Sequence, residues 1–261
     1  MNEHRVDTWA ELQEILFADS WQEDIARFRS NLAFRGRNNA SDDLRTSLMR
    51  LGGDLAAQEN HLVRNFRKYA VAGVAPQDSV WNWLALGQHH GLPTRMLDWT
   101  YSPYVALHFA TAERKQFERD GAVWTLDFVR AHELVPAPLR AALDREGANL
   151  FTTEMLAEVA PELSALEQLG EEFVAFVEPP SFDERIVNQF ALFSFMSRPD
   201  GSLDDWAGAH AELVRKVVIP AELKWEVRDK LDQANVTERV LFPGLDGLSR
   251  WLARQYFPRV R

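Results

Sequence analysis

The sequence predicts an α+β fold in which helices dominate the first half of the chain and the second half is richer in strands. In the first half, apolar residues recur every three or four positions, as on the buried face of a helix. In the second half, apolar and polar residues alternate over short runs, a pattern typical of half-buried strands. The 261 residues are 46% hydrophobic and contain no internal repeat or evident linker. We therefore expect a single domain over residues 1–261 with a sizeable core.

Helical spacing in the first half predicts helices over residues 8–17, 54–72, 80–89 and 104–117. We expect a strand over residues 31–36 and an extended segment over residues 92–99. Pro93 disfavours helix at the residue before it, and Gly91 can end the preceding helix by adopting a positive φ.

Alternation in the second half predicts strands over residues 122–128, 172–177, 185–196 and 213–219. Between the first two of these strands we expect a helical insertion, residues 137–170. Its two predicted helices cover residues 138–146, ended by Gly147, and residues 153–169. Two later helices are predicted over residues 221–231 and 245–256.

The charge and the cysteine content exclude several classes of function. A formal net charge of −10 argues against attraction of nucleic acid or anionic membrane to the whole surface, but it is compatible with a local basic cleft. The absence of cysteine excludes disulfides, cysteine-ligated zinc and a thiol nucleophile. The sequence has no signal-peptide pattern and no apolar run approaching ~20 residues. We therefore expect a cytoplasmic protein without a membrane segment.

The densest group of polar and aromatic residues lies between Gln88 and Ala110. Residues 88–100 read QHHGLPTRMLDWT, and residues 101–110 read YSPYVALHFA. Core packing does not require two histidines, an arginine, an aspartate and two threonines so close together. This polar density predicts a functional site.

This block and three other segments resemble the FRG domain family, named for its Phe-Arg-Gly motif. The other segments are FRG at residues 34–36, RIVNQFALF at 185–193 and LFPGLDG at 241–247. The resemblance spans roughly residues 30–250. Its most specific part is the block at residues 88–110, whereas Ala191 stands where the family tends to have glycine.

A second resemblance, to the mono-ADP-ribosyltransferases, implies a chemistry. That family has an aromatic-Arg-Gly motif on an early strand, a hydroxyl-rich turn before a helix with an Ala-x-x-Phe-Ala pattern, and a glutamate on a later strand. Residues 34–36 resemble the first motif, and residues 98–110 resemble the second. This resemblance implies a central β-sheet split by a cleft, with flanking helices and with NAD as the substrate. It also implies transfer of ADP-ribose to a macromolecule or hydrolysis of NAD, and the FRG resemblance implies a toxin or phage-defence effector.

The expected site follows from these motifs. The expected catalytic residues are Arg35, Asp98 and Gln189. The expected nucleotide-binding residues are Arg35, Gly36, His90, Thr94, Arg95, Trp99, Thr100 and Ser102. A strand-end arginine offers a rigid fork for a diphosphate, the glycine after it lets a ligand approach the backbone, and a tryptophan can stack on nicotinamide. No metal site is expected, because adjacent histidines at 89 and 90 cannot share one helix face.

Several alternatives remain open at this point. Gln189 stands where the transferases have glutamate, and an amide can hydrogen-bond ribose hydroxyls but supplies no charge. The cleft could therefore bind a nucleotide or RNA as a sensor without turnover. A metal-independent ribonuclease that uses His90, Arg95 and Asp98 is a third alternative. Arg35 could instead hold Asp98 in a buried ion pair. The sequence leaves the acceptor, any regulatory partner and the oligomeric state open.

Overall fold

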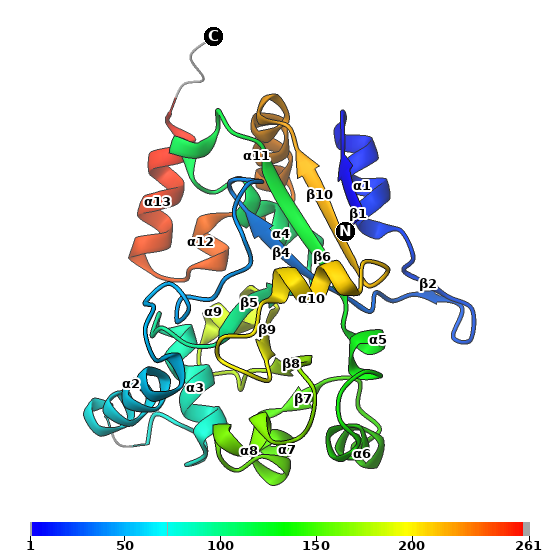
Figure 1. Ribbon diagram of the computed structural model, residues 1–261. Helices are drawn as coiled ribbons and strands as arrows, with labels where there is room; N and C mark the ends of the chain where they lie inside the picture. Colours follow the sequence, from blue (N-terminus) through cyan, green and yellow to red (C-terminus); the bar gives the residue numbers. More distant parts are fainter. Residues whose placement is uncertain (1, 72, 258–261) are drawn as a thin grey trace.

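An eight-stranded mixed sheet forms the centre of the computed structural model, which describes residues 2–71 and 73–257 (Figure 1). The strand order is β1-β10-β6-β4-β5-β9-β8-β7. The strands are β1 (Asn2–Arg5), β4 (Leu32–Arg37), β5 (Met96–Thr100), β6 (Gly121–Asp127), β7 (Phe151–Thr152), β8 (Val174–Glu178), β9 (Ala191–Met196) and β10 (Val214–Ile219). A separate hairpin of β2 (Trp21–Gln22) and β3 (Arg27–Phe28) projects from the body of the protein.

The sheet divides into two halves between β4 and β5. These neighbouring strands share one residue pair, Phe34 with Thr100. By contrast, β4 pairs with β6 over six residues and β5 pairs with β9 over five. Residues of both β4 and β5 line a cavity at this division. The fold is α+β, as the sequence predicts.

Helices pack on both faces of the sheet (Figure 1). They are α1 (Trp9–Phe17), α2 (Leu55–Tyr69), α3 (Val80–His89), α4 (Pro103–Ala110), α5 (Phe128–His132), α6 (Ala137–Glu146), α7 (Thr153–Val159), α8 (Leu163–Glu167), α9 (Glu184–Asn188), α10 (Leu203–Ala209), α11 (Lys224–Gln233), α12 (Glu238–Leu241) and α13 (Leu245–Gln255). Short 3₁₀ turns lie at Arg114–Gln116 and Ala221–Leu223. Within the described ranges, no helix combines the length and the apolar character needed to cross a membrane.

The side chains of β5 alternate between two separate hydrophobic clusters, one on each face of the sheet. Met96 packs in one cluster with Trp81 of α3, whereas Leu97 and Trp99 pack in another with Trp206 of α10. Side chains at alternate positions of a strand point to opposite faces of the sheet, so Asp98 shares the face of Met96. At the cavity, that face carries the polar residues of β5.

Most predicted elements are confirmed, and the capping residues explain their starts. Thr8, Asp54 and Ser79 each accept a hydrogen bond from a backbone N–H of the helix that follows. The predicted helix over residues 80–89 is α3 with the same bounds. The predicted helix over residues 54–72 ends at Tyr69, and its last predicted residue, Ala72, lies outside the described residues.

Two predicted helices prove to be shorter than expected. The helix predicted over 104–117 ends at Ala110, where the Thr111 hydroxyl donates to the Leu107 carbonyl at 2.8 Å and the chain turns away. The helix predicted over 153–169 is two helices, α7 and α8, because Pro161 follows Ala160 and has no N–H to continue the ladder.

The strand predicted over 185–196 is wrong in its first half. The Asp183 side chain accepts from the Ile186 N–H at 3.1 Å and caps helix α9. Phe190, with φ of 48°, then turns the chain into β9. Gln189 therefore lies at the end of a helix, two residues before the strand on which it was expected.

Candidate functional site

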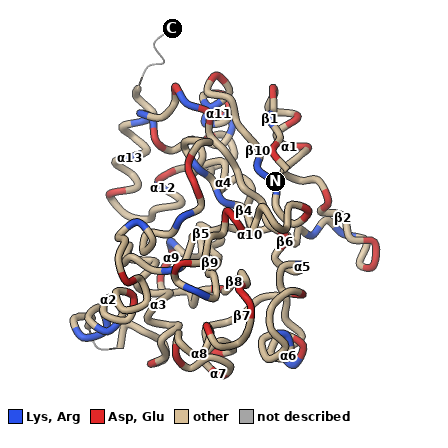
Figure 2. The backbone as a smooth tube through the Cα atoms, in the orientation of Figure 1, with Lys and Arg blue, Asp and Glu red and all other residues tan. Residues whose placement is uncertain are grey.

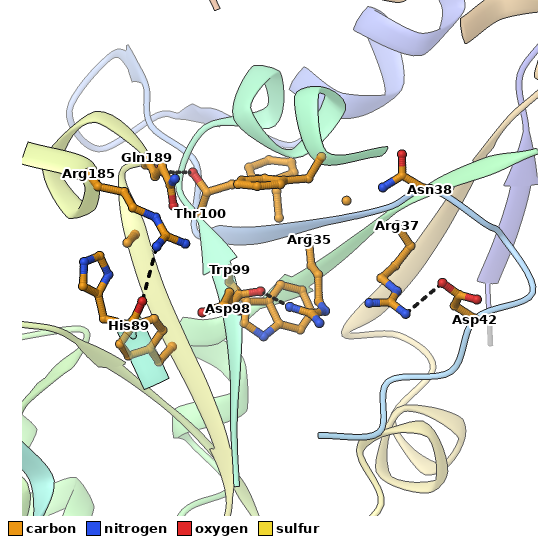
Figure 3. Close-up of a pocket in the computed structure, with 15 residues that line it drawn as sticks. Arg35, Arg37, Asn38, Asp42, His89, Asp98, Trp99, Thr100, Arg185 and Gln189 are labelled. Atoms are coloured by element: carbon orange, nitrogen blue, oxygen red, sulfur yellow. Dashed lines mark hydrogen bonds and ion pairs between the residues drawn. The ribbon is translucent and has the colours of Figure 1, made fainter. Parts of the chain in front are cut away.

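The cavity at the division of the sheet is lined by β4 and β5, with residues of β9, α4 and α9 completing its walls (Figure 3). This inner lobe has a volume of about 280 Å³, and Phe109 and Phe193 give it apolar walls. An outer lobe of about 510 Å³ adjoins it, beside the loop that carries Arg45 and Arg50. Arg35, like several of its neighbours, lines both lobes. We call the two lobes together the cleft.

Arg35 extends from β4 into the cleft and is half-buried there. One of its terminal nitrogens donates to the backbone carbonyl of Asp98, while its Nε has no hydrogen-bond partner among the described residues. Burial lowers the pKa of Arg35; together with the opposing effect of Asp98 and the smaller lowering by Arg37 and Arg50, it brings this pKa to about 10. The cleft therefore holds a cation that the protein itself leaves partly uncompensated.

Two further arginines, Arg37 and Arg185, face the cleft and, like Arg35, leave part of their hydrogen-bonding capacity unused. Arg37 Nη2 donates to Asp42 Oδ2 at 2.8 Å, and Arg185 Nη1 donates to the His89 carbonyl at 3.3 Å (Figure 3). Neither Nε has a partner within the described parts of the chain. Along the backbone in Figure 2, acidic and basic residues are spread through all parts of the fold. The convergence of three arginines from β4 and α9 on one cavity is thus a local feature of a chain with net charge −10.

Asp98 is exposed to the cleft and is held in place by a hydrogen-bond relay. Thr94 Oγ accepts from the Met96 N–H at 3.1 Å, so its hydroxyl hydrogen is directed to Gln88 Oε1. This fixes the orientation of the Gln88 amide, whose Nε2 donates to Asp98 Oδ1 at 3.0 Å. Thr94 itself is fully buried and does not line the cleft. Its expected contact with a nucleotide is therefore corrected to a role in positioning Asp98.

Arg95 does not line the cleft, and its predicted nucleotide-binding role is wrong. Its side chain is 2% exposed, and its Nε donates to Glu59 Oε2 at 2.7 Å. Its other nitrogens donate to the Ser197 carbonyl at 2.9 Å and to Glu167 at 3.1 Å. Arg95 precedes Met96 and ties β5 to α2 through a buried carboxylate. The ribonuclease alternative required Arg95 beside His90, and the structure separates them.

Trp99 and Ser102 also take structural positions. The Trp99 ring is 4% exposed, packs edge-on against Phe176, and donates from Nε1 to Ser194 Oγ at 2.8 Å. Its predicted stacking on nicotinamide is therefore corrected to core packing, although Trp99 is among the residues that line the inner lobe. Ser102 accepts from the Val105 N–H and caps α4, and it lines neither lobe.

Gln189 lines the inner lobe together with Arg35, as expected. Its side-chain nitrogen donates to the Leu241 carbonyl at 2.9 Å, and its own carbonyl accepts from the Thr100 hydroxyl at 2.7 Å. Gln189 therefore connects α9 to α12 and to β5, and its Oε1 and the second hydrogen of its Nε2 remain available to a ligand. Thr100 lines the cavity but uses its hydroxyl hydrogen in this contact.

Gly36 is explained by the packing of α4 on β4. A Cβ at this position would lie 1.9 Å from the Ala106 carbonyl oxygen and 2.6 Å from the Ala110 nitrogen. These distances are far inside van der Waals contact, so only glycine lets the helix approach the strand this closely. Gly36 also lines the inner lobe, as expected, so the close packing of α4 is a second reason for glycine at this position. The second Ala of the Ala-x-x-Phe-Ala pattern forms part of this contact.

The two adjacent histidines differ in environment. His90 is exposed and lines the outer lobe. The partial burial of its ring is the largest cause that lowers its pKa, and the neighbouring His89 is the second. His89 is 8% exposed and hydrogen-bonds through Nε2 to Asp183 Oδ2 at 2.8 Å. Nothing among residues 2–71 and 73–257 groups three or more His, Cys, Asp or Glu side chains in a metal-binding arrangement.

Sequence reasoning missed four arginines that line the cleft: Arg37, Arg45, Arg50 and Arg185. For Arg37 a signal was present, because it follows Arg35 by two residues and therefore lies on the same face of β4. The others come from a loop and from a helix, where no periodicity fixes the direction of a side chain.

Comparison with known protein families gives a match in the first half of the chain. The FRG domain model matches residues 30–119, which include β4, α2, α3, β5 and α4 and thus both sides of the sheet division. No curated protein and no solved structure matches the chain. The resemblance to the FRG domain family is thereby confirmed over residues 30–119.

Proposed function

We propose that the cleft binds NAD and that the protein transfers ADP-ribose from NAD to a macromolecule or hydrolyses NAD. The observation that carries this proposal is the convergence of Arg35, Arg37 and Arg185 on a cavity with apolar walls. A dinucleotide presents both complementary features, because its phosphates are anionic and its bases are flat. The resemblance of residues 34–36 and 98–110 to the transferase motifs supports the same ligand.

The position of the arginines suggests how such a ligand would lie. Arg35 and Arg37 line both lobes, so a diphosphate bound by their guanidinium forks would direct one nucleoside into each lobe. Phe109 in the inner lobe offers an aromatic ring to nicotinamide. The outer lobe, at about 510 Å³, has room for adenosine.

The reaction requires little acid–base chemistry. When the nicotinamide–ribose bond breaks, nicotinamide leaves as a neutral molecule with the bonding electrons, and the ribose becomes oxocarbenium-like. Water or an acceptor nucleophile then forms the new bond at C1′ and releases a proton. Asp98, whose carboxylate accepts from the Gln88 amide and forms no ion pair with any described residue, is the anion we assign to stabilise this centre. Gln189 Oε1 would hydrogen-bond the ribose hydroxyls.

A second candidate is a sensor that binds the nucleotide without turnover. The observation that favours it is the position of Gln189, whose amide nitrogen is engaged by Leu241 and which supplies no negative charge. Under this alternative the arginines bind the phosphates and no bond is broken. A toxin or phage-defence role is a proposal under either candidate, since it follows from the family resemblance.

Nicotinamide release distinguishes the two candidates. Purified protein is incubated with NAD, with and without cell extract, and nicotinamide is measured alongside NAD binding. Release that Asp98→Asn abolishes supports the enzyme, and binding without release supports the sensor. Arg145→Ala, which removes an exposed arginine outside the cleft, is the matched control and should behave as the wild type. Absence of NAD binding would contradict both candidates.

A further inference from the structure

The outer lobe contains a second cationic group that the bound diphosphate would not use. Arg45 and Arg50 both line this lobe but not the inner one. Arg45 Nε donates to Asp43 Oδ2 at 2.8 Å, and Arg50 donates to the other oxygen of the same carboxylate. Both arginine side chains are about half exposed, at 54% and 46%.

Around Asp43 the arginines outnumber the carboxylates, whereas around Arg95 and Arg145 the carboxylates outnumber the arginines. Arg95 and Arg145 each pair with two carboxylates. At Asp43, two guanidinium groups share one carboxylate, and neither has a second acidic partner within the described ranges. One positive charge is therefore uncompensated at the edge of the outer lobe.

The segment that carries these arginines is anchored in the core. Leu44, Thr46 and Leu48 are at most 4% exposed, whereas Arg45 and Ser47 between them, and Arg50 shortly after, are exposed. The backbone is fixed by the Leu44 N–H, which donates to Asp204 Oδ2 at 2.8 Å, and the Leu48 N–H, which donates to the Thr94 carbonyl at 3.4 Å. Because the backbone is already held in place without a ligand, little of its conformational freedom would be lost when an anion binds.

We infer that Arg45 and Arg50 form a subsite for a phosphomonoester carried by the dinucleotide, so that the preferred ligand is NADP and not NAD. A phosphomonoester has nearly two negative charges at neutral pH and three acceptor oxygens. It can therefore accept hydrogen bonds from two guanidinium forks while Asp43 holds both of them. The Ser47 hydroxyl, which also lines the outer lobe, is a further neutral donor. This inference rests on the proposed binding of a dinucleotide in the cleft.

The competing ligand of the same chemistry is the terminal phosphate of a nucleic acid. A dinucleotide is favoured because the outer lobe adjoins the inner lobe through Arg35 and Arg37, which places the subsite beside the expected adenosine. The lining residues of the outer lobe also include no tryptophan, tyrosine or phenylalanine on which successive bases of a strand could stack.

Calorimetric titration tests the inference directly. The titrants are NAD, NADP and a short oligonucleotide with or without a 5′-phosphate. We expect NADP to bind about tenfold more tightly than NAD, which corresponds to ~1.4 kcal/mol. The double variant Arg45→Ala/Arg50→Ala should bring the two affinities together. Arg145→Ala/Arg198→Ala, which removes two exposed arginines that do not line the cleft, should retain the preference.

The outcomes separate the subsite from the proposed function. Equal affinities for NAD and NADP, or a preference that survives the double variant, would overturn the subsite and leave dinucleotide binding intact. Tighter binding of the 5′-phosphorylated oligonucleotide than of NADP would assign the subsite to nucleic acid and overturn the inference. Failure of both dinucleotides to bind would overturn the proposed function and, with it, the subsite.

Discussion

Arg35 donates its hydrogen bond to the backbone carbonyl of Asp98 and not to the Asp98 carboxylate. The two residues come from β4 and β5, the strands on either side of the division of the sheet. The guanidinium therefore spans the division without neutralising the carboxylate. Both charges remain available to a ligand, and removal of Arg35 leaves no carboxylate buried and unpaired.

This relationship predicts the behaviour of Arg35→Met. Because the pKa of Arg35 is lowered to about 10, the fold disfavours its charged form, and an apolar side chain of similar length relieves that cost. We expect the free energy of unfolding to stay unchanged or to rise by about 1 kcal/mol, as for other buried charges replaced by apolar residues. Thermal melts check this. A loss of ~3 kcal/mol or more would show that Arg35 is a scaffold residue instead.

Arg95→Ala should give the opposite result. The substitution leaves Glu59, which is fully buried, without its cation, and such a loss costs about 3–5 kcal/mol. The double variant Arg95→Met/Glu59→Leu, which removes both charges, should recover most of this loss. If Arg95→Ala melts within a few degrees of the wild type, the ion pair is not the reason for its burial.

Gly36→Ala tests the contact between α4 and β4. The added Cβ would lie 1.9 Å from the Ala106 oxygen, and overpacking of this kind costs about 3 kcal/mol. Gly208→Ala is the matched control, because it lies in helix α10 with no atom within 4 Å of the new Cβ. The control should be stabilised by about 0.5–1 kcal/mol. Equal effects of the two substitutions in urea unfolding would contradict the close approach.

Thr94 offers a test of the relay to Asp98. Thr94→Val removes the hydroxyl that fixes the Gln88 amide, whereas Thr94→Ser retains it. We expect Thr94→Val to weaken NAD binding or turnover by about tenfold and to shift the side-chain amide resonances of Gln88. Thr94→Ser should restore both. A serine variant as weak as valine would mean that the methyl group, not the hydroxyl, is the important part of Thr94.

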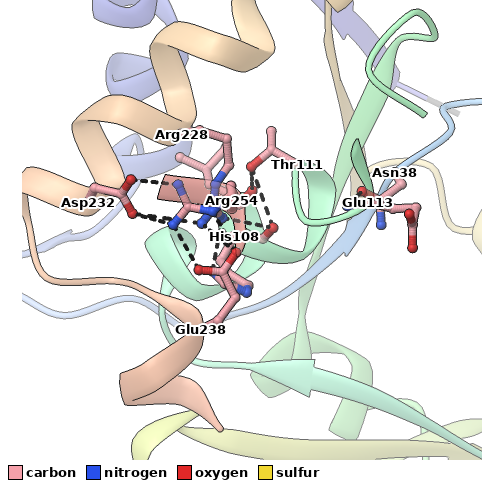
Figure 4. Close-up of polar contacts among 9 residues, drawn as sticks. Asn38, His108, Thr111, Glu113, Arg228, Asp232, Glu238 and Arg254 are labelled. Atoms are coloured by element: carbon pink, nitrogen blue, oxygen red, sulfur yellow. Dashed lines mark hydrogen bonds and ion pairs between the residues drawn. The ribbon is translucent and has the colours of Figure 1, made fainter. Parts of the chain in front are cut away.

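Two buried histidines predict loss of stability in acid. His132 donates from Nδ1 to the Asn149 carbonyl and accepts at Nε2 from the Phe176 N–H, so a second proton breaks the latter bond. His108 accepts from Arg228, so its protonation would place two cations together (Figure 4). Burial, the largest cause for each ring, lowers the pKa of His132 to about 4 and that of His108 to about 3.

The sign of this effect follows from the number of bound protons. Between the ordinary histidine pKa of 6.5 and these lowered values, the unfolded chain binds more protons than the folded one. The free energy of unfolding should therefore fall as the pH falls below 6.5, by up to about 2.7 kcal/mol per pH unit where both histidines contribute. Urea unfolding at a series of pH values measures the slope. A curve that is flat between pH 6.5 and 4.5 would contradict the neutral state of both rings.

The sequence predicted those parts of the fold that depend on local patterns. Helix α3, strand β4 and the Gly147 helix end follow from spacing and from single-residue conformational preferences. Strand β1 carries no such pattern, because its residues are polar and all four are exposed, and it forms through parallel pairing with β10. Helix α9 depends on the Asp183 cap, which was not recognised.

The site was predicted less completely, because two arginines that were both expected to bind a nucleotide have opposite environments. Arg35 lines the cleft, whereas Arg95 is buried against Glu59, which is 36 residues away in the sequence. Neither the spacing of residues nor their type predicts that long-range pairing. Arg45 was missed for a similar reason, since it is exposed only because Leu44 and Thr46 on either side of it are buried in the core.

The most direct test of the central claim is a calorimetric titration of the protein with NAD, performed on the wild type, Arg35→Met and Arg145→Ala. The account predicts saturable binding to the wild type and to Arg145→Ala, and at least about tenfold weaker binding to Arg35→Met, although that variant remains folded. No binding by the wild type, or equal binding by Arg35→Met, would contradict a nucleotide cleft centred on Arg35.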